Sequence, residues 1–478
     1  MKRSRSIALA GSCLLLALGA FSQSQQKPST QTPPAAPRTA SVPKPVAFRS
    51  ADGRISGWKI SIPGNRPLAS PAIAEGKLFV GGGFGSHEFY AFDANTGDHL
   101  WTYHTADDGP TAAAVEDGRI AFNTESCELE VITTDGKPLW KKWLGDPLMS
   151  MPAIAGGMVY MAYPDSKADH KYYLAAFDIK TGRQAWKAPL ANEVITAPVI
   201  DADRVYAATI DGSMLAVNRT DGRVMWQETR NATSAPAVWK DQVYFSRGEE
   251  QKTQSGGKPA IQKTELLAAR LIGAPASAPV DMIETRQKAD YLDYTKNERS
   301  SMLTKQVQMD ASVGFATSKG AALMAPAQRN LGKATVNGIW AHQGSKPFVD
   351  QGRLYSSMGD NARSVDPATG KVIWSRKLRT GGSESDLDAL LTPPAIVNGK
   401  LFIASASGEV YALAEKSGDV LWTVKIGEPV SFQPTVANGH VYVATDGGTL
   451  YCLNTGDARD HGWLMWGANG AHNGMAGK

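Results

Sequence analysis

Residues that could carry chemistry are few and scattered in this chain of 478 residues. The one dense acidic run, SESDLD at 383–388, offers oxygens of the kind that calcium prefers, and a solvated loop is the alternative interpretation. The eight histidines follow no zinc-ligand spacing, and no nucleophile elbow or P-loop is present. The glycine-rich GGGFG at 81–85 leads into another predicted strand, which favours a hairpin loop over a phosphate cradle. The sequence therefore predicts no catalytic residues and no metal site.

A second group of candidates lies in the segment 280–346, which interrupts the regular pattern described below. Function concentrates on loops held by a rigid scaffold, so we predict this segment to be the functional elaboration. Its composition predicts a helix over 281–308, because good helix formers dominate there without Gly or Pro. The alternative is that the segment only covers one mouth or side of the fold. The candidate binding residues, chosen by residue type, are Tyr291, Tyr294, Arg329, Trp340 and His342.

The elements that must position these residues are internal repeats. Proline followed eight residues later by Phe or Tyr recurs seven times in a regular phase, and an eighth unit at Ala113 has the same rhythm. Each unit divides into two hairpins of short apolar strands with Gly-containing turns. A repeated unit of four antiparallel strands is typical of a β-propeller blade. The units begin at residues 71, 113, 152, 198, 236, 347, 394 and 434.

A second signature, Gly followed four residues later by Trp, occurs six times in the same phase. The glycine accepts the positive φ of a turn, and the indole is expected in the outermost strand, where it can fill the wedge between neighbouring sheets. Six copies are too many for one active site, so we interpret them as structural. The structural residues are Trp101, Trp140, Trp186, Trp226, Trp374 and Trp422, with Gly97, Gly182 and Gly370 among the turn glycines.

These signatures predict an all-β fold, an eight-bladed β-propeller of four-stranded antiparallel blades, with a partly helical insertion between the fifth and sixth units. Seven blades is the alternative if the interrupted fifth unit is incomplete. In that unit we expect a polar hairpin loop over 246–264 and a returning strand over 265–271. The stretch around Trp58 is predicted to complete the last blade and close the ring. The residues expected near the central channel are Ser70, Met151, Ala197, Ala235, Lys346 and Gln433.

At AFDANTGDHLW, AFDIKTGRQAW and SVDPATGKVIW the chain resembles the repeats of the pyrroloquinoline-quinone (PQQ)-like propellers. This family includes the PQQ-dependent alcohol dehydrogenases and BamB, the propeller lipoprotein of the outer-membrane assembly machinery. The end, WLMWGANGAHNG, resembles the closing motif of the family. The dehydrogenases place a disulfide between adjacent cysteines over the quinone, and no Cys-Cys pair exists here. The resemblance therefore implies the fold, and it implies PQQ with calcium only as an alternative.

The N-terminus predicts export. A positive MKRSRS precedes an apolar stretch, which together indicate a signal peptide over 1–22. Cys13 lies too early in that stretch for the usual lipid anchor, so acylation is the lesser alternative. Residues 23–47 are rich in Pro, Ser and Gln and predict a disordered linker before the propeller at 48–478.

These observations favour a secreted protein, periplasmic or extracellular, that is monomeric and is not transmembrane after signal cleavage. A net charge of +4, mixed along the chain, gives no support for nucleic-acid binding. Cys127 and Cys452 are expected to be buried free thiols. The predicted function is a non-enzymatic scaffold that binds a protein partner in the cell envelope, without a cofactor. The alternatives are a PQQ-dependent oxidoreductase with a degenerate site, and binding of a small molecule or glycan through the insertion.

Overall fold

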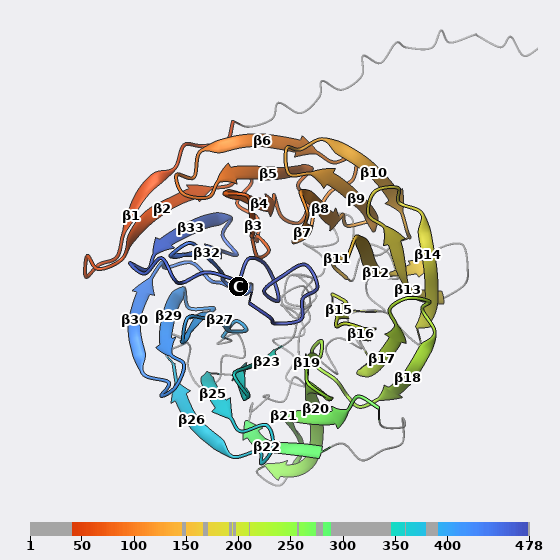
Figure 1. The fold of residues 1–478 in the computed structure, drawn as a ribbon. Helices are drawn as coiled ribbons and strands as arrows, with labels where there is room; N and C mark the ends of the chain where they lie inside the picture. The colour runs from red at the N-terminus through yellow and green to blue at the C-terminus, as the bar shows by residue number, and fades with distance from the viewer. Residues whose placement is uncertain are drawn as a thin grey trace, which may run out of the picture. The chain divides into compact units, whose positions relative to one another are not determined.

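Eight antiparallel sheets stand around a central axis and form a ring (Figure 1). A computed structural model describes residues 41–145, 150–165, 171–190, 194, 197–209, 211–255, 258–273, 281–287, 346–358, 360–378 and 391–476. Within these ranges there are 33 strands and no helix. The predicted all-β, eight-bladed propeller is confirmed, and the seven-bladed alternative is wrong. The predicted signal peptide lies outside the described residues.

The first four blades each contain four consecutive strands, with the first strand nearest the axis and the fourth outermost (Figure 1). Blade 1 contains β3 (Ala72–Ala74), β4 (Lys77–Gly81), β5 (Glu88–Asp93) and β6 (His99–His104). Blade 2 contains β7 (Ala114–Glu116), β8 (Arg119–Asn123), β9 (Glu128–Thr133) and β10 (Pro138–Trp143). Blade 3 contains β11 (Ala153–Ala155), β12 (Met158–Asp165), β13 (Lys171–Asp178) and β14 (Gln184–Leu190). Blade 4 contains β15 (Val199–Ile200), β16 (Arg204–Ala208), β17 (Ser213–Asn218) and β18 (Val224–Thr229).

The remaining blades keep this order except at the point of closure. Blade 5 contains β19 (Ala237–Trp239), β20 (Gln242–Ser255), β21 (Lys258–Leu271) and β22 (Asp281–Gln287). Blade 6 contains β23 (Pro347–Asp350), β24 (Arg353–Met358), β25 (Asn361–Val365) and β26 (Val372–Lys377). Blade 7 contains β27 (Ala395–Val397), β28 (Lys400–Ala404), β29 (Glu409–Ala414) and β30 (Val420–Lys425). Blade 8 contains β31 (Thr435–Ala437), β32 (His440–Ala444) and β33 (Thr449–Asn454), joined by β1 (Val46–Arg49) and β2 (Ser56–Ser61).

The repeated prolines correctly predicted where the inner strands begin. Each inner strand begins at the predicted start of its unit or one residue later. Tight turns follow these strands. In blade 1, Glu75 and Gly76 both have positive φ, 52° and 72°, as a two-residue hairpin turn of the right twist requires. Between blades, aromatic rings fill the core, and Phe89 of blade 1 stacks on Phe122 of blade 2 with ring centroids 4.4 Å apart.

The N-terminal strands close the ring as predicted. Strand β2 pairs with β33 in continuous antiparallel register, with Trp58 opposite Cys452. Strand β1 then pairs with β2, so that blade 8 has five strands. β1 begins at Val46, within the predicted linker of 23–47. Gly57 lets β2 approach the sheet, since a Cβ built there would lie 1.8 Å from the carbonyl oxygen of Cys452.

Most outermost strands carry a β-bulge. The register shifts directly before the repeat Trp in the six blades that have one, which leaves one unpaired residue there, and β22 of blade 5 is also irregular. Bulges twist an edge strand away from further pairing. Neither β2 nor β1 shows such a shift. The unpaired residues are Leu100, Leu139, Ala185, Met225, Ile373 and Leu421.

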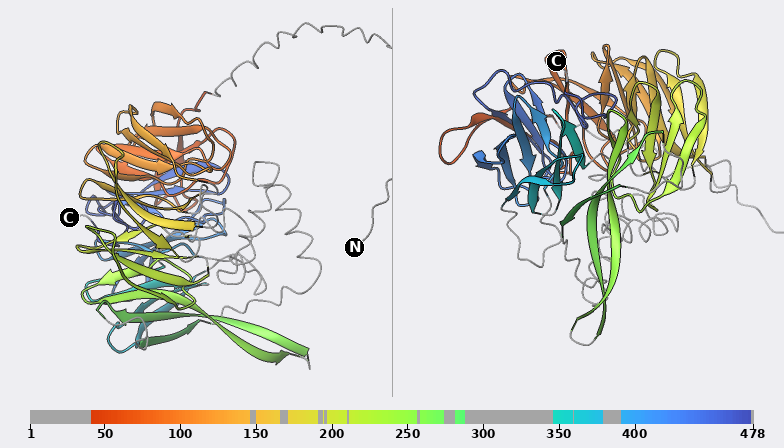
Figure 2. Two further views of the ribbon diagram at one scale, coloured as in Figure 1. Left: turned by 90° about the vertical axis from the view of Figure 1, so that its right-hand side faces the viewer. Right: turned by 60° about the horizontal axis from the view of Figure 1, so that its bottom comes forward.

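The fifth unit departs from the sequence prediction in two ways. Residues 246–255 and 258–264, predicted as part of a polar hairpin loop over 246–264, belong to paired strands, since β20 and β21 run antiparallel from Gln242–Leu271 to Ser255–Lys258. This long hairpin extends out of the ring (Figure 2). The helix predicted from residue 281 is also wrong over its first seven residues, because β22 there supplies the fourth strand of blade 5. Pairing with β21 overrides the local helix propensity.

The two faces of the ring carry different connections. Antiparallel order places the loops between second and third strands, and the links between blades, on one face, called here the loop face. The short turns between first and second and between third and fourth strands lie on the opposite, turn face. The long hairpin of blade 5 leaves from the loop face, and the C-terminal end lies on the other side of the ring (Figure 2).

Candidate binding surfaces

The five candidate binding residues of the insertion, Tyr291, Tyr294, Arg329, Trp340 and His342, lie outside the described residues. The acidic run 383–388 does so as well. Candidate surfaces in the described part of the chain are therefore built from the blade junctions, the central channel and the rim of the ring.

Five of the blade junctions within the described residues are organised around an indole that packs on a turn glycine. The Trp186 side chain of blade 3 lies against the turn of blade 4, where a Cβ on Gly222 would come within 2.5 Å of the ring. Its Nε1–H donates to the carbonyl oxygen of Arg219 in the same turn, at 2.9 Å. The same pair of contacts links Trp101 to Gly136, Trp140 to Gly182, Trp374 to Gly418 and, at the closure, Trp58 to Gly97. Gly370 has a φ of 70° in the turn before Trp374.

The junction between blades 4 and 5 is built differently, because blade 5 has no Gly-Trp turn. The guanidinium of Arg270 stacks over the Trp226 ring at 4.0 Å from its centroid. Arg270 also pairs with Glu228 at 2.8 Å, and both side chains are buried. The buried Nε1–H of Trp226 has no hydrogen-bond acceptor among the described residues. At the junction between blades 7 and 8, the Trp422 ring packs at a tilt against the Phe402 ring, with the ring centroids 6.0 Å apart.

At the described positions the central channel is lined mostly by small or uncharged side chains. Ser70, Met151, Ala197, Ala235 and Gln433 are all buried, whereas Lys346 is partly exposed. Ser70 Oγ donates to the carbonyl oxygen of Gln433 at 2.7 Å, and Gln433 Nε2 donates to that of Pro394 at 2.9 Å. Gln433 therefore ties the inner strands of blades 7, 8 and 1 together. This link was not predicted from the sequence.

The C-terminal segment, residues 455–476, crosses the turn-face end of this channel (Figure 1). It pairs in turn with four inner strands: the N–H groups of Val436, Ile73, Ile154 and Ile200 donate to carbonyl oxygens of the segment, namely those of Trp463, Leu464, Gly470 and Ala471, at 2.6–2.9 Å. The buried His472 lies within hydrogen-bond distance of the carbonyl oxygens of Trp466 and Pro152, and burial lowers its pKa. The closing motif thus covers the channel and fastens blades to one another.

A buried carboxyl group lies between blades 1 and 2. The hydroxyl of Tyr103 on β6 donates to Oε2 of Glu130 on β9 at 2.6 Å, and Glu130 is 1% exposed. Burial raises the pKa of Glu130. Nothing in the repeat pattern distinguishes Glu130 from its neighbours, so sequence reasoning missed this pair.

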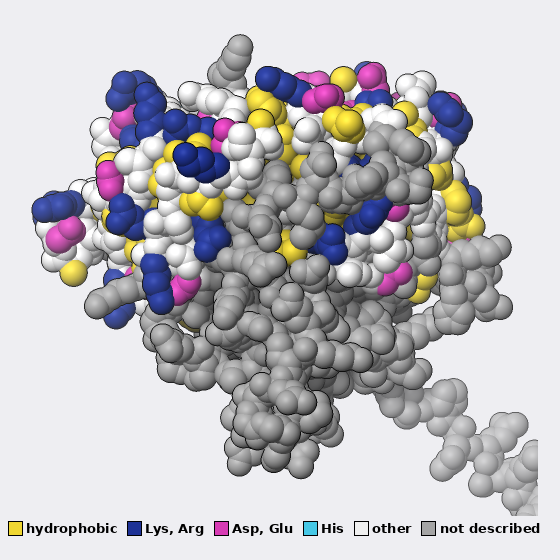
Figure 3. All heavy atoms as spheres, turned by 90° about the horizontal axis from the view of Figure 1, so that it is seen from below, with side chains coloured by type: hydrophobic (Ala, Val, Ile, Leu, Met, Phe, Trp, Pro, Cys, Tyr) yellow, Lys and Arg dark blue, Asp and Glu magenta, His cyan; other side chains and the backbone are white. Residues whose placement is uncertain are grey.

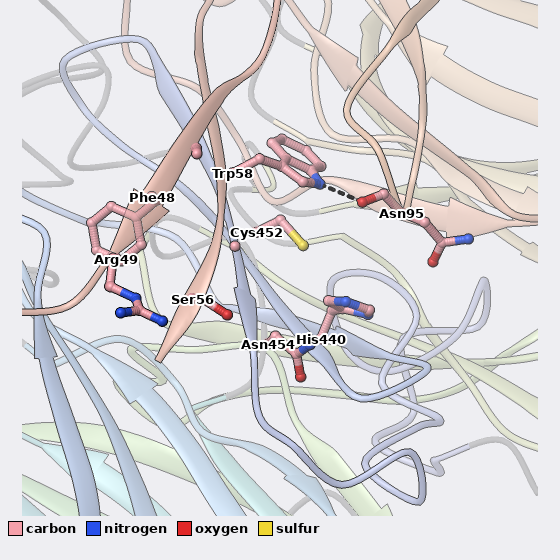
Figure 4. A pocket seen from close by; sticks show the side chains of 10 residues that line it. Phe48, Arg49, Ser56, Trp58, Asn95, His440, Cys452 and Asn454 are labelled. Carbon is pink, nitrogen blue, oxygen red and sulfur yellow. Dashed lines mark hydrogen bonds between the residues drawn. The ribbon is translucent and has the colours of Figure 1, made fainter. Parts of the chain in front are cut away.

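A cleft of about 530 Å³ opens where blade 8 faces the turn of blade 1. Propeller blades diverge with distance from the axis, and Trp58 fills the gap at the level of the fourth strand, its Nε1–H donating to the carbonyl oxygen of Asn95 at 2.8 Å. The fifth strand β1 overhangs a neighbour that has only four strands, and the cleft lies there (Figure 4). Its lining consists of Ala47, Phe48, Arg49, Ser56, Gly57, Trp58, Asn95, His440, Cys452 and Asn454.

The cleft has a mixed lining, more apolar than polar, and Arg49 gives it positive charge. Arg49 forms no ion pair among the described residues, and no carboxylate lines the cleft. Burial lowers the pKa of His440, which favours the neutral imidazole. The thiol of Cys452 is buried, and burial raises its pKa, as expected for an inert thiol. The prediction that Cys127 and Cys452 are buried free thiols is confirmed.

Other features of the described residues bear on the alternatives. No three His, Cys, Asp or Glu side chains come together as a metal site in the described ranges. Over the same ranges no helix is long and apolar enough to cross a membrane. Basic and acidic side chains alternate with hydrophobic ones on the face that Figure 3 shows, without a continuous basic stripe among the coloured residues.

Comparison with known families agrees with this architecture. A closed ring of eight blades, joined by Gly-Trp junctions, is a propeller of the PQQ-like class. The profile of the family described as "Outer membrane protein assembly factor BamB" matches residues 44–167, 134–258 and 358–466, which is more than half of the chain. The chain belongs to this family.

Individual relatives include both outer membrane protein assembly factors and quinoprotein dehydrogenases. BamB of Burkholderia pseudomallei (strain K96243) is 27% identical over 36% of this chain and 44% of its own length. The quinoprotein ethanol dehydrogenase of Pseudomonas aeruginosa is 24% identical over 30% of this chain and 26% of its own length. The chain thus matches less than half the length of either relative. The crystal structure of BamB from Moraxella catarrhalis superposes with a TM-score of 0.52 at 13% identity, covering 86% of this chain and 100% of that one, which shows a shared fold.

Proposed function

We propose that this chain is a protein-binding propeller of the periplasm that acts as a scaffold in the assembly of outer membrane proteins. The observation that carries the proposal is the family match over the repeats, whose description names an outer membrane protein assembly factor. A rigid ring closed by β2 and fastened by the C-terminal segment suits a scaffold, since it presents loops and edges without rearranging. The predicted signal peptide over 1–22 supports export to this compartment.

The proposal is tested by cross-linking in intact cells. The chain, tagged and expressed at its natural level, is cross-linked in the envelope, and the cross-linked proteins are identified. We expect components of the outer membrane assembly machinery to be recovered. Recovery of periplasmic proteins in proportion to their abundance alone would contradict the proposal. A variant lacking residues 288–345 tests the insertion, because this deletion spares β22, which completes blade 5.

A PQQ-dependent oxidoreductase is the second candidate, and the quinoprotein dehydrogenases among the relatives are the observation that favours it. Among the described residues, the channel positions Ser70, Ala197 and Ala235 offer no carboxylates, and no three His, Cys, Asp or Glu side chains gather as a metal site, so these residues lend no support to a calcium–quinone centre. Thermal unfolding with and without PQQ plus Ca²⁺ tests this candidate. A ligand at about 100 times its Kd adds about 2.7 kcal/mol of stability, so a calcium-dependent shift would favour the enzyme.

Binding of a small molecule or glycan through the insertion is a third possibility and rests on residue types alone. Tyr291, Tyr294, Trp340 and His342 are side chains that stack on or hydrogen-bond to such ligands. Comparing ligand binding by the whole chain and by the variant lacking 288–345 tests it.

A further inference from the structure

We infer that the free edge of β1 is a docking edge for an extended segment of a partner protein, in which acidic and apolar residues alternate. This inference rests on the proposed function, since it names the kind of partner segment that a protein-binding propeller would take. The binding mode is addition of a strand to an exposed sheet edge, where backbone hydrogen bonds supply affinity and alternate side chains supply specificity.

The pairing of β1 is regular, unlike that of most outer strands in the ring. Seven of the eight blades end in a strand whose pairing contains a register shift, and bulged edges resist further strand pairing. The outer strand β2 of blade 8 has no shift, and it is the strand that accepts an additional strand, β1. β1 is also in regular register, and among the described residues it pairs only with β2. Within the described part of the chain, β1 is therefore the one regular outer edge, and it is exposed, with Val46 59% accessible.

The backbone groups of β1 point alternately toward β2 and toward the free edge. The N–H of Ser50, the residue after β1, donates to the carbonyl oxygen of Ile55 at 2.8 Å, so Ser50 points its backbone groups toward the β2 side. Backbone groups alternate in direction along an antiparallel strand. The N–H and C=O groups of Arg49 and Ala47 therefore point to the free edge, where an incoming strand can pair with them.

The cleft lies beside this edge. Ala47 lies opposite Trp58 and Arg49 opposite Ser56, so their side chains share the face that borders the cleft. Every second side chain of an added strand would extend over the same face. The cleft of about 530 Å³ has room for such side chains and contains the Arg49 guanidinium and the amides of Asn95 and Asn454.

The segment around β1 and β2 is positively charged. Residues 44–59 contain four basic side chains, Lys44, Arg49, Arg54 and Lys59, against one acidic side chain, Asp52. The acidic residues of the adjacent turn, Asp93 and Asp98, are hydrogen-bonded within that turn. A partner segment with glutamate or aspartate on the cleft side is therefore complementary. Its alternate residues would lie on the opposite face, beside Val46 and Phe48, where apolar side chains fit.

The test is fluorescence anisotropy of the purified chain with a labelled eight-residue peptide in which glutamate alternates with valine. One control peptide carries lysine in place of glutamate, and a second carries N-methyl groups on the backbone amides of one edge, which prevents strand pairing but keeps the charges. We expect binding of the first peptide and binding weaker by about tenfold or more for both controls. Equal binding of the N-methylated peptide, or no binding of the first peptide, would overturn the inference.

Variants of the chain locate the site. Ala47→Pro removes the N–H that points to the free edge, which proline tolerates on an edge strand, and should weaken peptide binding about tenfold. Ala47→Ser keeps that N–H and should bind as the wild type does. Arg49→Glu should abolish binding, whereas Arg54→Glu, an equal change of charge on the exposed hairpin turn, should have little effect. Equal weakening by the two charge reversals would contradict a site at this edge.

Two further outcomes are decisive. Sedimentation of the chain alone tests whether a second copy occupies the edge, and a dimer abolished by Ala47→Pro would show that the acidic partner was wrongly assigned. The unfolding midpoint of Ala47→Pro should equal that of the wild type, and the N-methylated peptide decides the question if that variant fails to fold. Failure here leaves the cross-linking test of the proposed function intact, because partners would still be recovered through another surface.

Discussion

At the scale of single residues, the tryptophans of the repeat act between blades. Their spacing from a turn glycine indicated a structural role in the outer strand, and the structure places each indole on the glycine turn of the following blade where that turn exists. The identity of the hydrogen-bond acceptor could not be predicted, because it is a backbone carbonyl oxygen whose position depends on how adjacent blades pack. The buried Tyr103–Glu130 pair likewise could not be predicted from the sequence, because burial of a single acidic residue produces no periodic pattern.

The contribution of the indole hydrogen bond can be isolated by two matched substitutions. Trp186→Phe removes a buried donor with an acceptor at 2.9 Å, and Trp226→Phe removes one with no acceptor among the described residues. The exposure of the two side chains is nearly equal, 8% and 7%. We expect Trp186→Phe to lower the free energy of unfolding by about 1 kcal/mol more than Trp226→Phe. Urea denaturation measures both, and equal losses would show that only ring packing matters.

Glu130 should make stability depend on pH. Burial raises its pKa in the folded state, so the folded chain holds this proton more tightly than the unfolded chain. The stabilising contribution is present below the ordinary pKa of glutamate and is lost as the pH rises through the raised value. Glu130→Gln keeps an acceptor for Tyr103 and removes the buried charge. Its stability relative to the wild type should therefore increase from about pH 4 to about pH 8.

Urea midpoints over that pH range measure this effect. Glu128→Gln, on the same strand but partly exposed and paired with Lys141, controls for the loss of one negative charge. A pH-independent difference between Glu130→Gln and the wild type would show that Glu130 is not the titrating group.

At the scale of elements, the strands that repeat from blade to blade could be predicted from the sequence. The irregular strands of blade 5 could not. The repeat spacing predicted the starts of the inner strands, the turn glycines and the closure of the ring by the strand around Trp58. The long β20–β21 hairpin and β22 were missed because their sequence is polar or helix-favouring, and pairing within the blade decides their structure. The insertion that carries Tyr291 and Trp340 lies outside the described residues.

Ring closure should depend on one glycine. Gly57→Ala places a Cβ where the carbonyl oxygen of Cys452 lies, so β2 cannot pair with β33 without moving. We expect a loss of about 3 kcal/mol or more in the free energy of unfolding, of the size seen for disrupted cores. Gly53→Ala, on the hairpin between β1 and β2, meets open space and should cost only the strain of its positive φ, about 1 kcal/mol. Urea denaturation compares the two, and similar losses would contradict a closure role for β2.

At the scale of the whole molecule, the ring is held shut at its rim by β2 and at its centre by the C-terminal segment. Sequence reasoning identified the closing motif by resemblance, but could not show that it pairs with the inner strands of blades 8, 1, 3 and 4 in succession. That path depends on where eight inner strands meet, which is a property of the assembled ring.

The stabilising role of the C-terminal segment can be measured by hydrogen exchange at individual backbone amides. Deletion of 469–478 removes the acceptors of Ile154 and Ile200 but keeps Trp463 and Leu464. Hydrogen exchange should show lost protection at the first two amides and retained protection at those of Ile73 and Val436. Unchanged exchange at Ile154 and Ile200 would mean that the segment does not stabilise the inner strands.

The central claim is that this propeller serves the assembly of outer membrane proteins, and its most direct test is made in cells. The amount of folded outer membrane proteins is measured with the chain deleted, and again after it is restored. We predict a decrease on deletion, recovery with the wild type, and no recovery with Gly57→Ala, whose ring closure is impaired. Unchanged amounts of folded outer membrane proteins after deletion would contradict the claim.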